Sequence, residues 1–426
     1  MQQPMSKTLE HKLHRLLNNR RKSSTLRTLT LSTPSQVDFS SNDFLSLSTS
    51  PLLKSLYLAE IQKSNLPLGS GGSRLLDGNS LYAEALEREI SEFHGAEEGL
   101  LFNSGFDANA GFFACVPQKG DVIVYDELVH ASVHDGMRLS RAVKTVGFKH
   151  NCVKDLRKVL EGLLEETEGL RRGETNVIVA VESIYSMDGD VAPLKEIVSV
   201  VEGVLGRDRG YIVVDEAHST GVLGPKGRGL VCELGLEKHI FARLHTFGKA
   251  LAGDGAIILG SPTLRHYLIN YARPLIYTTF LSYPSLALIR SSYQLLRTGQ
   301  TVPLQEHLHH LMQTLFASLQ QLHNTSSASR CLLNIPNACP QSPIFSIQLQ
   351  RPRELAKFLQ MRGMMIRAVV PPTVPWGTER VRVCLHAGNT VEEVERLIRV
   401  LKEWCEEQVQ GSDNAHEASW TDRARL

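Results

Sequence analysis

The sequence of 426 residues lacks the features that define several large classes of protein. No apolar run approaches the roughly 18 residues that a membrane span requires. The N-terminus has no apolar stretch of the kind found in secretory signals. The net charge is +1 and no long basic block is present, which gives no electrostatic basis for binding nucleic acid. We therefore expect no membrane span and no nucleic-acid partner.

The number and spacing of the cysteines bear on disulfides, metal sites and the redox compartment. The seven cysteines are odd in number, scattered along the chain, and include no Cys-x-x-Cys pair. This pattern favours neither a disulfide framework nor a zinc site, so no metal site is expected. A reducing compartment suits a chain with this cysteine usage.

The length exceeds that of one ordinary core, so two domains with extensions are expected. The expected parts are an N-terminal helix and arm (1–50), a large domain (51–290), a small C-terminal domain (291–407) and a disordered polar tail (408–426). Within the first part, leucines beside basic residues predict an amphipathic helix that lies against the body of the protein.

From about residue 99, short apolar runs alternate with helical stretches. The runs predicted to form strands are 99–102, 122–125, 142–146, 177–182, 211–215, 241–246 and 256–260. Such alternation is typical of a mostly parallel sheet covered by helices on both faces. After about residue 290, two long helical stretches lead to a smaller α+β unit with strands near 344–349, 365–370 and 381–385. The expected fold class is therefore α/β.

Unusual polar residues follow several of the predicted strands. In open parallel sheets, ligands bind beyond the carboxyl ends of the strands. We therefore expect these residues to converge on one site. They are Asn103, Ser104, Asp126, His130, Ser183, Ser186, Asp215, His218, Thr246 and Lys249.

Lys249 lies in the segment His245-Thr-Phe-Gly-Lys249, after a predicted strand and before a glycine-rich turn. A phosphate-binding loop would require Gly-x-x-x-x-Gly-Lys-Ser/Thr, whereas Ala250 follows the lysine here. The remaining interpretations are an amine nucleophile that binds an aldehyde, and an ordinary surface lysine in a turn.

Lysine nucleophiles most often hold pyridoxal 5′-phosphate (PLP), which needs a carboxylate at its ring nitrogen, a stacking partner and donors for its phosphate. Asp215 ends an apolar run and suits the carboxylate role, because an acid buried there without a partner would be costly. Gly105 and Phe106 precede a helix predicted over 108–115, whose N-terminus favours phosphate. His130 has a flat ring suited to stacking, and His218 can bond the phenolic oxygen of the cofactor.

Other interpretations stay open at this point. His130 beside His134 also fits an ordinary surface pair. Asp215-Glu-Ala-His218 looks like a helicase-type box, but no phosphate-binding loop lies upstream. Asp188 and Asp190 also fit a hydrolase with paired carboxylates, which would leave the lysine without a role.

Eight motifs, in one order, resemble those of the α-oxoamine synthases, PLP-dependent enzymes of fold type I. The similarity runs from about residue 13 to about residue 403. It implies a large domain with a mostly parallel seven-stranded sheet and a small C-terminal α+β domain. The motifs are Phe39-Ser-Ser-Asn-Asp-Phe-Leu, Gly69-Ser-Gly-Gly-Ser-Arg, Ser104-Gly-Phe, His130-Ala-Ser, Ser186-Met-Asp-Gly-Asp-Val-Ala-Pro-Leu, Val214-Asp-Glu-Ala-His-Ser-Thr-Gly-Val-Leu-Gly, Thr246-Phe-Gly-Lys249 and Pro371-Pro-Thr-Val-Pro.

The resemblance implies roles for single residues. Lys249 would form the Schiff base, Asp215 would pair with the pyridine nitrogen, and both would be catalytic together with His130. Arg382 would hold the amino-acid carboxylate. The residues expected to bind the cofactor are Lys249, Asp215, His218, Ser186, Thr246, Gly105, Phe106, His130, Thr278 and Thr279. The residues expected to bind the substrates are Arg27, Asn42, His130, Thr373 and Arg382.

The implied reaction is the decarboxylative condensation of an amino acid with an acyl-CoA. Arg27 and the Pro371-Pro-Thr-Val-Pro segment favour L-alanine and pimeloyl-CoA. The alternatives within the family use glycine with acetyl-CoA (2-amino-3-ketobutyrate ligase), glycine with succinyl-CoA (5-aminolevulinate synthase), or serine in a soluble serine palmitoyltransferase-like reaction. A non-catalytic subunit of the same fold is disfavoured, because Lys249, Asp215 and His130 are retained together.

Two further features follow from the resemblance. Tyr277-Thr-Thr279 is similar to a segment that reaches the phosphate of a neighbouring subunit, which implies a homodimer with shared active sites. One departure from the family pattern is Ala250, at a position where glycine is usual. This change removes no chemical group.

The last three residues, Ala424-Arg-Leu426, fit a relaxed form of the small–basic–leucine peroxisomal address. We therefore expect a peroxisomal import receptor as a partner and the peroxisome as the destination. If the tripeptide is not read, the expected location is the cytoplasm.

A fluorescent protein that carries residues 408–426 at its C-terminus tests this expectation. The fusion should give a punctate signal in cells, and removal of Leu426 should make the signal diffuse, because the receptor reads the terminal tripeptide. A diffuse signal from both fusions would contradict the prediction.

Overall fold

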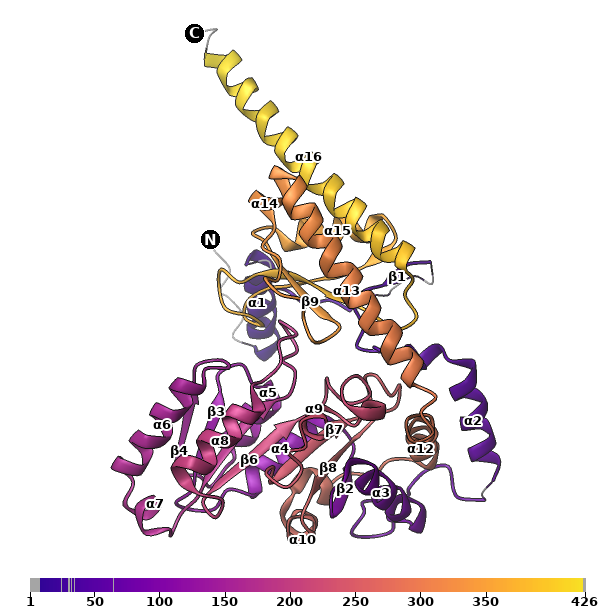
Figure 1. The fold of residues 1–426 in the computed structure, drawn as a ribbon, viewed down its shortest axis with the longest axis vertical. Helices are drawn as coiled ribbons and strands as arrows, with labels where there is room; N and C mark the ends of the chain where they lie inside the picture. The colour runs from indigo at the N-terminus through magenta and orange to yellow at the C-terminus, as the bar shows by residue number, and fades with distance from the viewer. Residues whose placement is uncertain are drawn as a thin grey trace.

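A seven-stranded sheet forms the centre of the larger part of the protein, as the computed structural model shows (Figure 1). The structure describes residues 8–423 except 24, 30, 32, 34 and 64, and side chains up to residue 410. The strand order is β2, β8, β7, β6, β5, β3, β4. The strands are β2 (Glu98–Phe102), β3 (Val122–Asp126), β4 (Lys144–Phe148), β5 (Val177–Glu182), β6 (Gly210–Asp215), β7 (Ala242–Thr246) and β8 (Ala256–Gly260).

The sheet is mostly parallel, as the sequence predicts. The pairs β7–β6, β6–β5, β5–β3 and β3–β4 are parallel. The strand β8 is antiparallel to both of its neighbours, β7 and β2. The predicted strand 142–146 begins two residues later, at Lys144, because the register places Lys144 opposite Val122.

Both faces of the sheet are buried, and β5 shows why its sequence is continuously apolar. Val177, Val179 and Val181 belong to one hydrophobic core, and the alternating Ile178 and Ala180 belong to another. Successive side chains of a strand point to opposite faces, so a strand covered on both sides needs apolar residues throughout. The helix α6 (Val153–Glu166) and the helix α8 (Leu194–Leu205) cover the first face, and α4 (Gly105–Cys115) and α10 (Pro262–Tyr271) cover the second.

A smaller unit contains a second sheet. Its order is β11, β12, β9, and both pairings are antiparallel. The strands are β9 (Ile344–Gln348), β11 (Arg367–Val369) and β12 (Arg380–Cys384). The helices on and around this sheet are α13 (Val302–Thr325), α14 (Ser327–Leu332), α15 (Pro352–Met361) and α16 (Val391–Arg423). The seven-stranded and smaller sheets confirm the predicted fold class.

The N-terminal segment is tied to this smaller unit. The strand β1 (Val37–Asp38) pairs in parallel with β10 (Met364–Met365), and the backbone of Phe39 accepts a hydrogen bond from Cys384. Residues near 40 therefore reach the site from the side of the smaller unit. The remaining elements are η1 (Leu47–Thr49), α2 (Pro51–Gln62), α3 (Leu81–His94), α5 (Ala131–Arg138), α7 (Glu168–Arg172), η2 (Pro225–Gly227), α9 (Leu230–Leu234), α11 (Arg273–Ile276) and α12 (Tyr283–Arg297).

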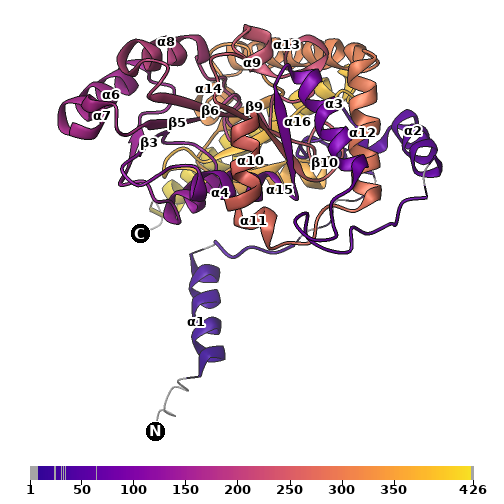
Figure 2. The same ribbon diagram turned by 90° about the horizontal axis from the view of Figure 1, so that it is seen from below.

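The N-terminal helix differs from the sequence expectation. The helix α1 (Leu9–Lys22) buries no residue and projects away from the body of the chain (Figure 2). Its leucines Leu9, Leu13, Leu16 and Leu17 remain 46–71% exposed. The expectation that this helix lies against the body was therefore wrong for the single chain, because periodicity shows that a helix has an apolar face but not what covers it.

Two helix boundaries also differ. The helix at 108–115 begins at Gly105, because the Ser104 hydroxyl accepts a hydrogen bond from the Asp107 N–H and so caps an earlier first turn. The tail expected to be disordered from residue 408 continues α16 as far as Arg423. Extending a packed helix needs no new nucleus, so helix can continue into polar sequence without periodicity. Residues 424–426 lie outside the described residues.

Within the described part of the chain, no helix is long and apolar enough to cross a membrane.

Candidate active site

A cavity of about 380 Å³ lies at the carboxyl ends of the strands. It brings together residues at or just after the ends of β2, β3, β5, β6 and β7. Seven of the polar residues predicted to converge line this cavity, whereas Asp126, Ser183 and Ser186 do not. Parallel strands deliver their carboxyl ends to one edge, which explains the convergence. The lining residues used below are Asn103, Gly105, Phe106, Asn109, His130, Glu182, Asp215, His218, Thr246 and Lys249.

Lys249 lies in the turn that follows β7 and is half-buried. Burial disfavours its charged form and lowers the pKa of its amine, whereas the charges of Asp215 and Glu182 act in the opposite direction. The neutral amine is the form that attacks an aldehyde and accepts a proton. Ala250 stands where glycine is usual, but its backbone does not adopt a positive φ. The non-glycine residue of this turn with a positive φ is Ala252, at 54°.

Asp215 ends β6 and is held by two hydrogen bonds. Its carboxylate accepts the Ala217 N–H at 2.9 Å and the Asn109 side-chain amide at 2.8 Å. Asn109 comes from α4, and its amide also donates to Ser132 Oγ at 3.1 Å. The carboxylate therefore has a defined orientation at the base of the cavity. Asn109 belongs to no recognised motif and was not predicted; its only sequence signal is its place one helical turn after Gly105.

Glu182 is a second acid in the cavity and was not predicted from the sequence. It ends β5 directly beside Asp215 in the parallel register and is only 4% exposed. Burial and the neighbouring Asp215 charge raise the pKa of Glu182 well above the usual range, whereas the Lys249 charge acts in the opposite direction. The available signal was its position as the last residue of a fully buried apolar run.

His130 is the N-cap of α5, and its ring is held by Ser132. Its Nδ1 accepts the Ser132 N–H at 3.2 Å and lies 2.7 Å from the Ser132 hydroxyl. Burial lowers the pKa of His130 further than the Asp215 charge raises it, so the neutral ring is favoured. With Nδ1 acting as an acceptor, the neutral ring carries its proton on Nε2 and can donate from that atom.

The cavity also contains groups suited to a phosphate. The first turn of α4 begins at Gly105, where free backbone N–H groups and the helix dipole favour an anion. A Cβ at Gly105 would lie 2.4 Å from Thr246 Cγ2, so only glycine allows this close approach. Thr246 Oγ1 is buried, with no hydrogen-bond partner among the described residues.

These residues fit PLP. Asp215 would supply the carboxylate for the ring nitrogen, and Thr246 with the start of α4 would supply donors for the phosphate. His218 Nδ1 is buried, and no partner is found in the described part of the chain. Burial above all, together with the nearby Lys249 charge, holds the pKa of His218 well below its usual range. The neutral ring is therefore available to bond the phenolic oxygen.

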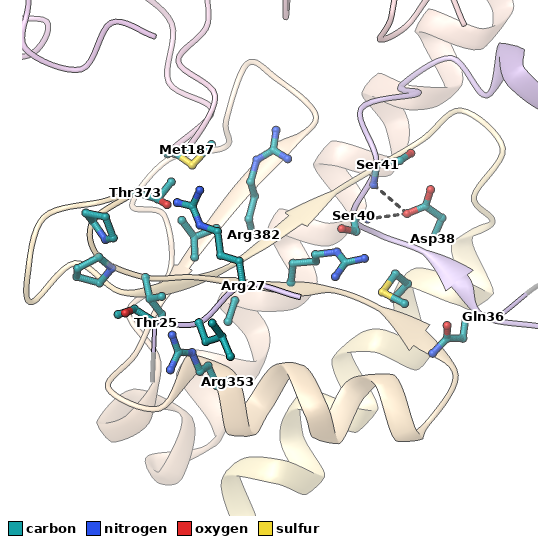
Figure 3. Close-up of a pocket in the computed structure, with 18 of the residues that line it drawn as sticks. Thr25, Arg27, Gln36, Asp38, Ser40, Ser41, Met187, Arg353, Thr373 and Arg382 are labelled. Atoms are coloured by element: carbon teal, nitrogen blue, oxygen red, sulfur yellow. Dashed lines mark hydrogen bonds between the residues drawn. The ribbon is translucent and has the colours of Figure 1, made fainter. Parts of the chain in front are cut away.

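The other predicted site residues lie outside this cavity but close to it. Arg27, Thr373 and Arg382 line a larger cavity of about 850 Å³ between the N-terminal arm and the smaller unit (Figure 3). Ser186 lines a third cavity of about 710 Å³, which shares Thr373 with the large one. Their roles stay predictions.

Arg382 is oriented from two sides. Its guanidinium donates to the Ser186 carbonyl at 2.6 Å and to Asn42 Oδ1 at 2.9 Å. Asn42 therefore positions Arg382, and a direct contact with substrate stays a prediction. Thr278 and Thr279 lie beside the cofactor cavity, where Asn103 donates to the Thr279 carbonyl at 2.6 Å.

The loop that carries Ser186 is anchored by His150. His150 Nδ1 lies 2.8 Å from Asp126 Oδ1, and its Nε2 lies 2.6 Å from Asp190 Oδ2. Burial opposes the charged form, but these two carboxylates outweigh it and raise the pKa of His150 to about 10. Arg380 pairs with Asp188 of the same loop. Asp188 and Asp190 therefore serve as ion-pair partners here, and a paired-carboxylate hydrolase finds no support in this geometry.

Comparison with known proteins gives a consistent result. Residues 34–401 match the family of class I and II aminotransferases. The chain is 52% identical over 402 residues to an 8-amino-7-oxononanoate synthase of Emericella nidulans, covering 94% of this chain and 97% of that protein. It is 40% identical over 416 residues to the aminoacyl transferase sphA of Aspergillus fumigatus, covering 94% and 88%. A solved serine palmitoyltransferase of S. paucimobilis with a bound PLP–myriocin aldimine superposes with a TM-score of 0.80 at 25% identity, covering 93% and 98%.

Replacing Lys249 with alanine removes the amine that would hold the cofactor. The purified Lys249→Ala protein should lose the absorption band of the lysine-linked cofactor near the edge of the visible range. Replacing the exposed Lys238 with alanine should leave the band unchanged. Persistence of the band in Lys249→Ala would show that another amine holds the cofactor.

The His150 anchor predicts a pH-dependent contribution to stability. Because its folded-state pKa of about 10 exceeds the unfolded value near 6.5, the contribution is complete below pH 6.5 and is lost as the pH rises through 10. The melting temperature of His150→Asn should therefore lie furthest below wild type at about pH 6, and the difference should narrow towards pH 10. His266→Asn, at an exposed histidine, is the control. A difference that is constant with pH would contradict the assignment.

Proposed function

The chain belongs to the class I and II aminotransferase family, and we propose that it condenses L-alanine with pimeloyl-CoA. The products would be 8-amino-7-oxononanoate, carbon dioxide and coenzyme A, a step of biotin biosynthesis. The observation that carries the proposal is the cavity in which Lys249, Asp215 and His130 meet, beside a larger cavity that contains Arg382.

The protein is a PLP-dependent transferase, and the residues described above fit this cofactor. When bound, PLP acts as an electron sink that stabilises negative charge on the substrate Cα. Asp215 would support this function, because its oriented carboxylate would keep the ring nitrogen protonated.

Lys249 would act as the base for the α-proton. An amine with a lowered pKa is more often neutral at physiological pH, and Lys249 lines the same cavity as Asp215 and His130. The nearby charges of Asp215 and Glu182 limit this lowering, so the amine can also hold the proton once it has been taken up.

Arg382 and His130 would direct the two substrates. The guanidinium of Arg382, fixed by Ser186 and Asn42, can bind the amino-acid carboxylate through two parallel hydrogen bonds. His130, with its proton on Nε2, can donate to the carbonyl oxygen of the acyl group. Decarboxylation after the new carbon–carbon bond forms would release carbon dioxide from the alanine carboxylate.

We also propose a homodimer with shared sites. The Tyr277-Thr-Thr279 segment lies at the rim of the cofactor cavity, and Tyr277 is 71% exposed. The apolar face of α1 is likewise uncovered in the single chain. A second copy would cover such surfaces.

Turnover of each amino acid with each acyl-CoA tests the reaction. Release of the coenzyme A thiol should be fastest with L-alanine and pimeloyl-CoA, and slower with glycine or serine and with acetyl-, succinyl- or palmitoyl-CoA. The combination of serine with palmitoyl-CoA tests the reaction for which the structural relative is named. No release with L-alanine and pimeloyl-CoA would refute the proposal.

Replacing Arg382 tests the binding of the amino acid. Arg382→Gln should raise the KM for alanine by about 10- to 100-fold, because a charge-assisted, paired hydrogen bond to the carboxylate is lost. Arg399→Gln, at an exposed arginine of α16, should leave KM within about twofold of wild type. An unchanged KM in Arg382→Gln would remove Arg382 from this role.

A further inference from the structure

Trp376 is an exposed tryptophan at the mouth of the third cavity. It lies between β11 and β12 and is 84% exposed. It lines the cavity of about 710 Å³ that also contains Ser186. A large aromatic ring left in water forgoes the free energy of burial, whereas the same ring beside a cavity offers a flat apolar surface to a ligand. The position of Trp376 therefore suits a binding role.

The turn that carries Trp376 is fixed by its own hydrogen bonds. The Thr378 N–H and the Thr378 hydroxyl both donate to the Pro375 carbonyl, at 3.3 and 2.8 Å. Gly377, between them, has a positive φ of 84°, which glycine adopts in such turns without strain. A ring presented by a fixed turn loses less conformational entropy when a ligand binds.

The same turn is tied to the loop that carries Ser186. Arg380 donates to the Thr378 carbonyl at 2.8 Å, and its guanidinium pairs with Asp188 of that loop. The Ser186 carbonyl in turn accepts a hydrogen bond from Arg382. The indole of Trp376 therefore has a defined position relative to the groups that would bind the amino acid.

The third cavity extends from Trp376 to the reacting groups. Val129 and Ala131, on either side of His130, line the third cavity, whereas His130 itself lines the cofactor cavity. Thr373 lines both the third cavity and the large one (Figure 3). A donor whose thioester carbonyl meets His130 can therefore extend one arm into each of these two cavities.

The two cavities differ in charge. Arg27 and Arg382 line the large one. Among the described residues that line the third cavity, Arg380 is the one arginine, and it pairs with Asp188. The apolar residues of the third cavity are Leu128, Val129, Ala131, Met187, Pro371, Pro372, Val374, Pro375 and Trp376. An acyl chain that ends in a carboxylate is better matched by the large cavity, and the uncharged pantetheine arm of coenzyme A by the third.

We propose that the third cavity holds the pantetheine arm of coenzyme A and that the Trp376 indole stacks on its adenine. Stacking on an aromatic side chain is a common way to bind a base, because every base has a flat π-face. Trp376 would then select coenzyme A thioesters over donors that carry only a phosphopantetheine arm, as acyl carrier proteins do. The inference rests on the proposed function for the use of an acyl thioester.

Two substitutions separate stacking from a merely apolar contact. Trp376→Phe retains a flat ring, whereas Trp376→Leu retains apolar bulk without one. Both variants should fold normally, because the side chain is exposed. Met361→Ala, at a 76% exposed position of α15 outside the third cavity, is the control for loss of an exposed apolar side chain.

Calorimetric titration of the holoenzyme with coenzyme A and with S-heptyl-coenzyme A measures the contact without turnover. The thioether cannot react, and it adds an alkyl chain to the same nucleotide. Trp376→Leu should weaken both ligands by about the same factor, roughly tenfold, whereas Trp376→Phe should stay within about threefold of wild type. A loss confined to S-heptyl-coenzyme A would assign the indole to the acyl chain, and no loss relative to Met361→Ala would leave it without a ligand. Either result would overturn the inference.

Tryptophan fluorescence tests the stacking directly. The chain has three tryptophans, of which Trp404 is 2% exposed. Coenzyme A should quench the emission of wild type, and this quenching should be absent in Trp376→Phe although the ligand still binds. Pantetheine, which lacks adenine, should not quench wild type. Equal quenching by coenzyme A in wild type and Trp376→Phe would contradict the proposed stack.

Turnover connects the contact to the choice of donor. The ratio of kcat/KM for pimeloyl-CoA to kcat/KM for the pimeloyl thioester of pantetheine should fall about tenfold in Trp376→Leu and stay close to wild type in Trp376→Phe. An unchanged ratio in Trp376→Leu would remove Trp376 from donor selection. If wild type turns over neither donor, the proposed reaction fails, whereas the calorimetric and fluorescence results still decide whether Trp376 binds adenine.

Discussion

Burial of the Lys249 amine beside two carboxylates is the constraint on which the site depends. Burial favours the neutral amine, and the charges of Asp215 and Glu182 favour the ammonium, so neither form is strongly excluded. This balance suits a residue that must give up and take back a proton. It exists because adjacent parallel strands place Glu182 and Asp215 side by side at the edge where the Lys249 turn begins.

The surrounding structure divides the chemistry between two units. The large sheet supplies the cofactor groups, whereas the smaller unit supplies Arg382 and most of the wall of the large cavity. The loop after β5 joins them, because His150 and Arg380 hold Asp190 and Asp188 from opposite sides. Arg382 in turn bonds the Ser186 carbonyl of that loop. The position of the amino-acid substrate relative to the cofactor therefore depends on these charged contacts.

Much of the cofactor site was predictable, because most of its residues lie at or just after the carboxyl end of a strand. Lys249, Asp215, His130, His218, Thr246, Gly105 and Phe106 were all expected at one edge, and they line one cavity. Asn109 and Glu182 were missed, since a helix interior and the end of an apolar run carry no motif. The packing of α1 was also misjudged, because an apolar helical face does not identify its partner.

The sequence by itself determined the fold class, the family and the residues that can perform the chemistry, because strand periodicity and motif order are local and linear properties. Only the tertiary structure decided which charges face one another. The register that sets Arg367 against Arg382, the burial that shifts the pKa of Lys249, and the meeting of His150 with Asp126 and Asp190 all join residues far apart in the chain. Electrostatic energies depend on distance and burial in three dimensions, which linear spacing does not contain.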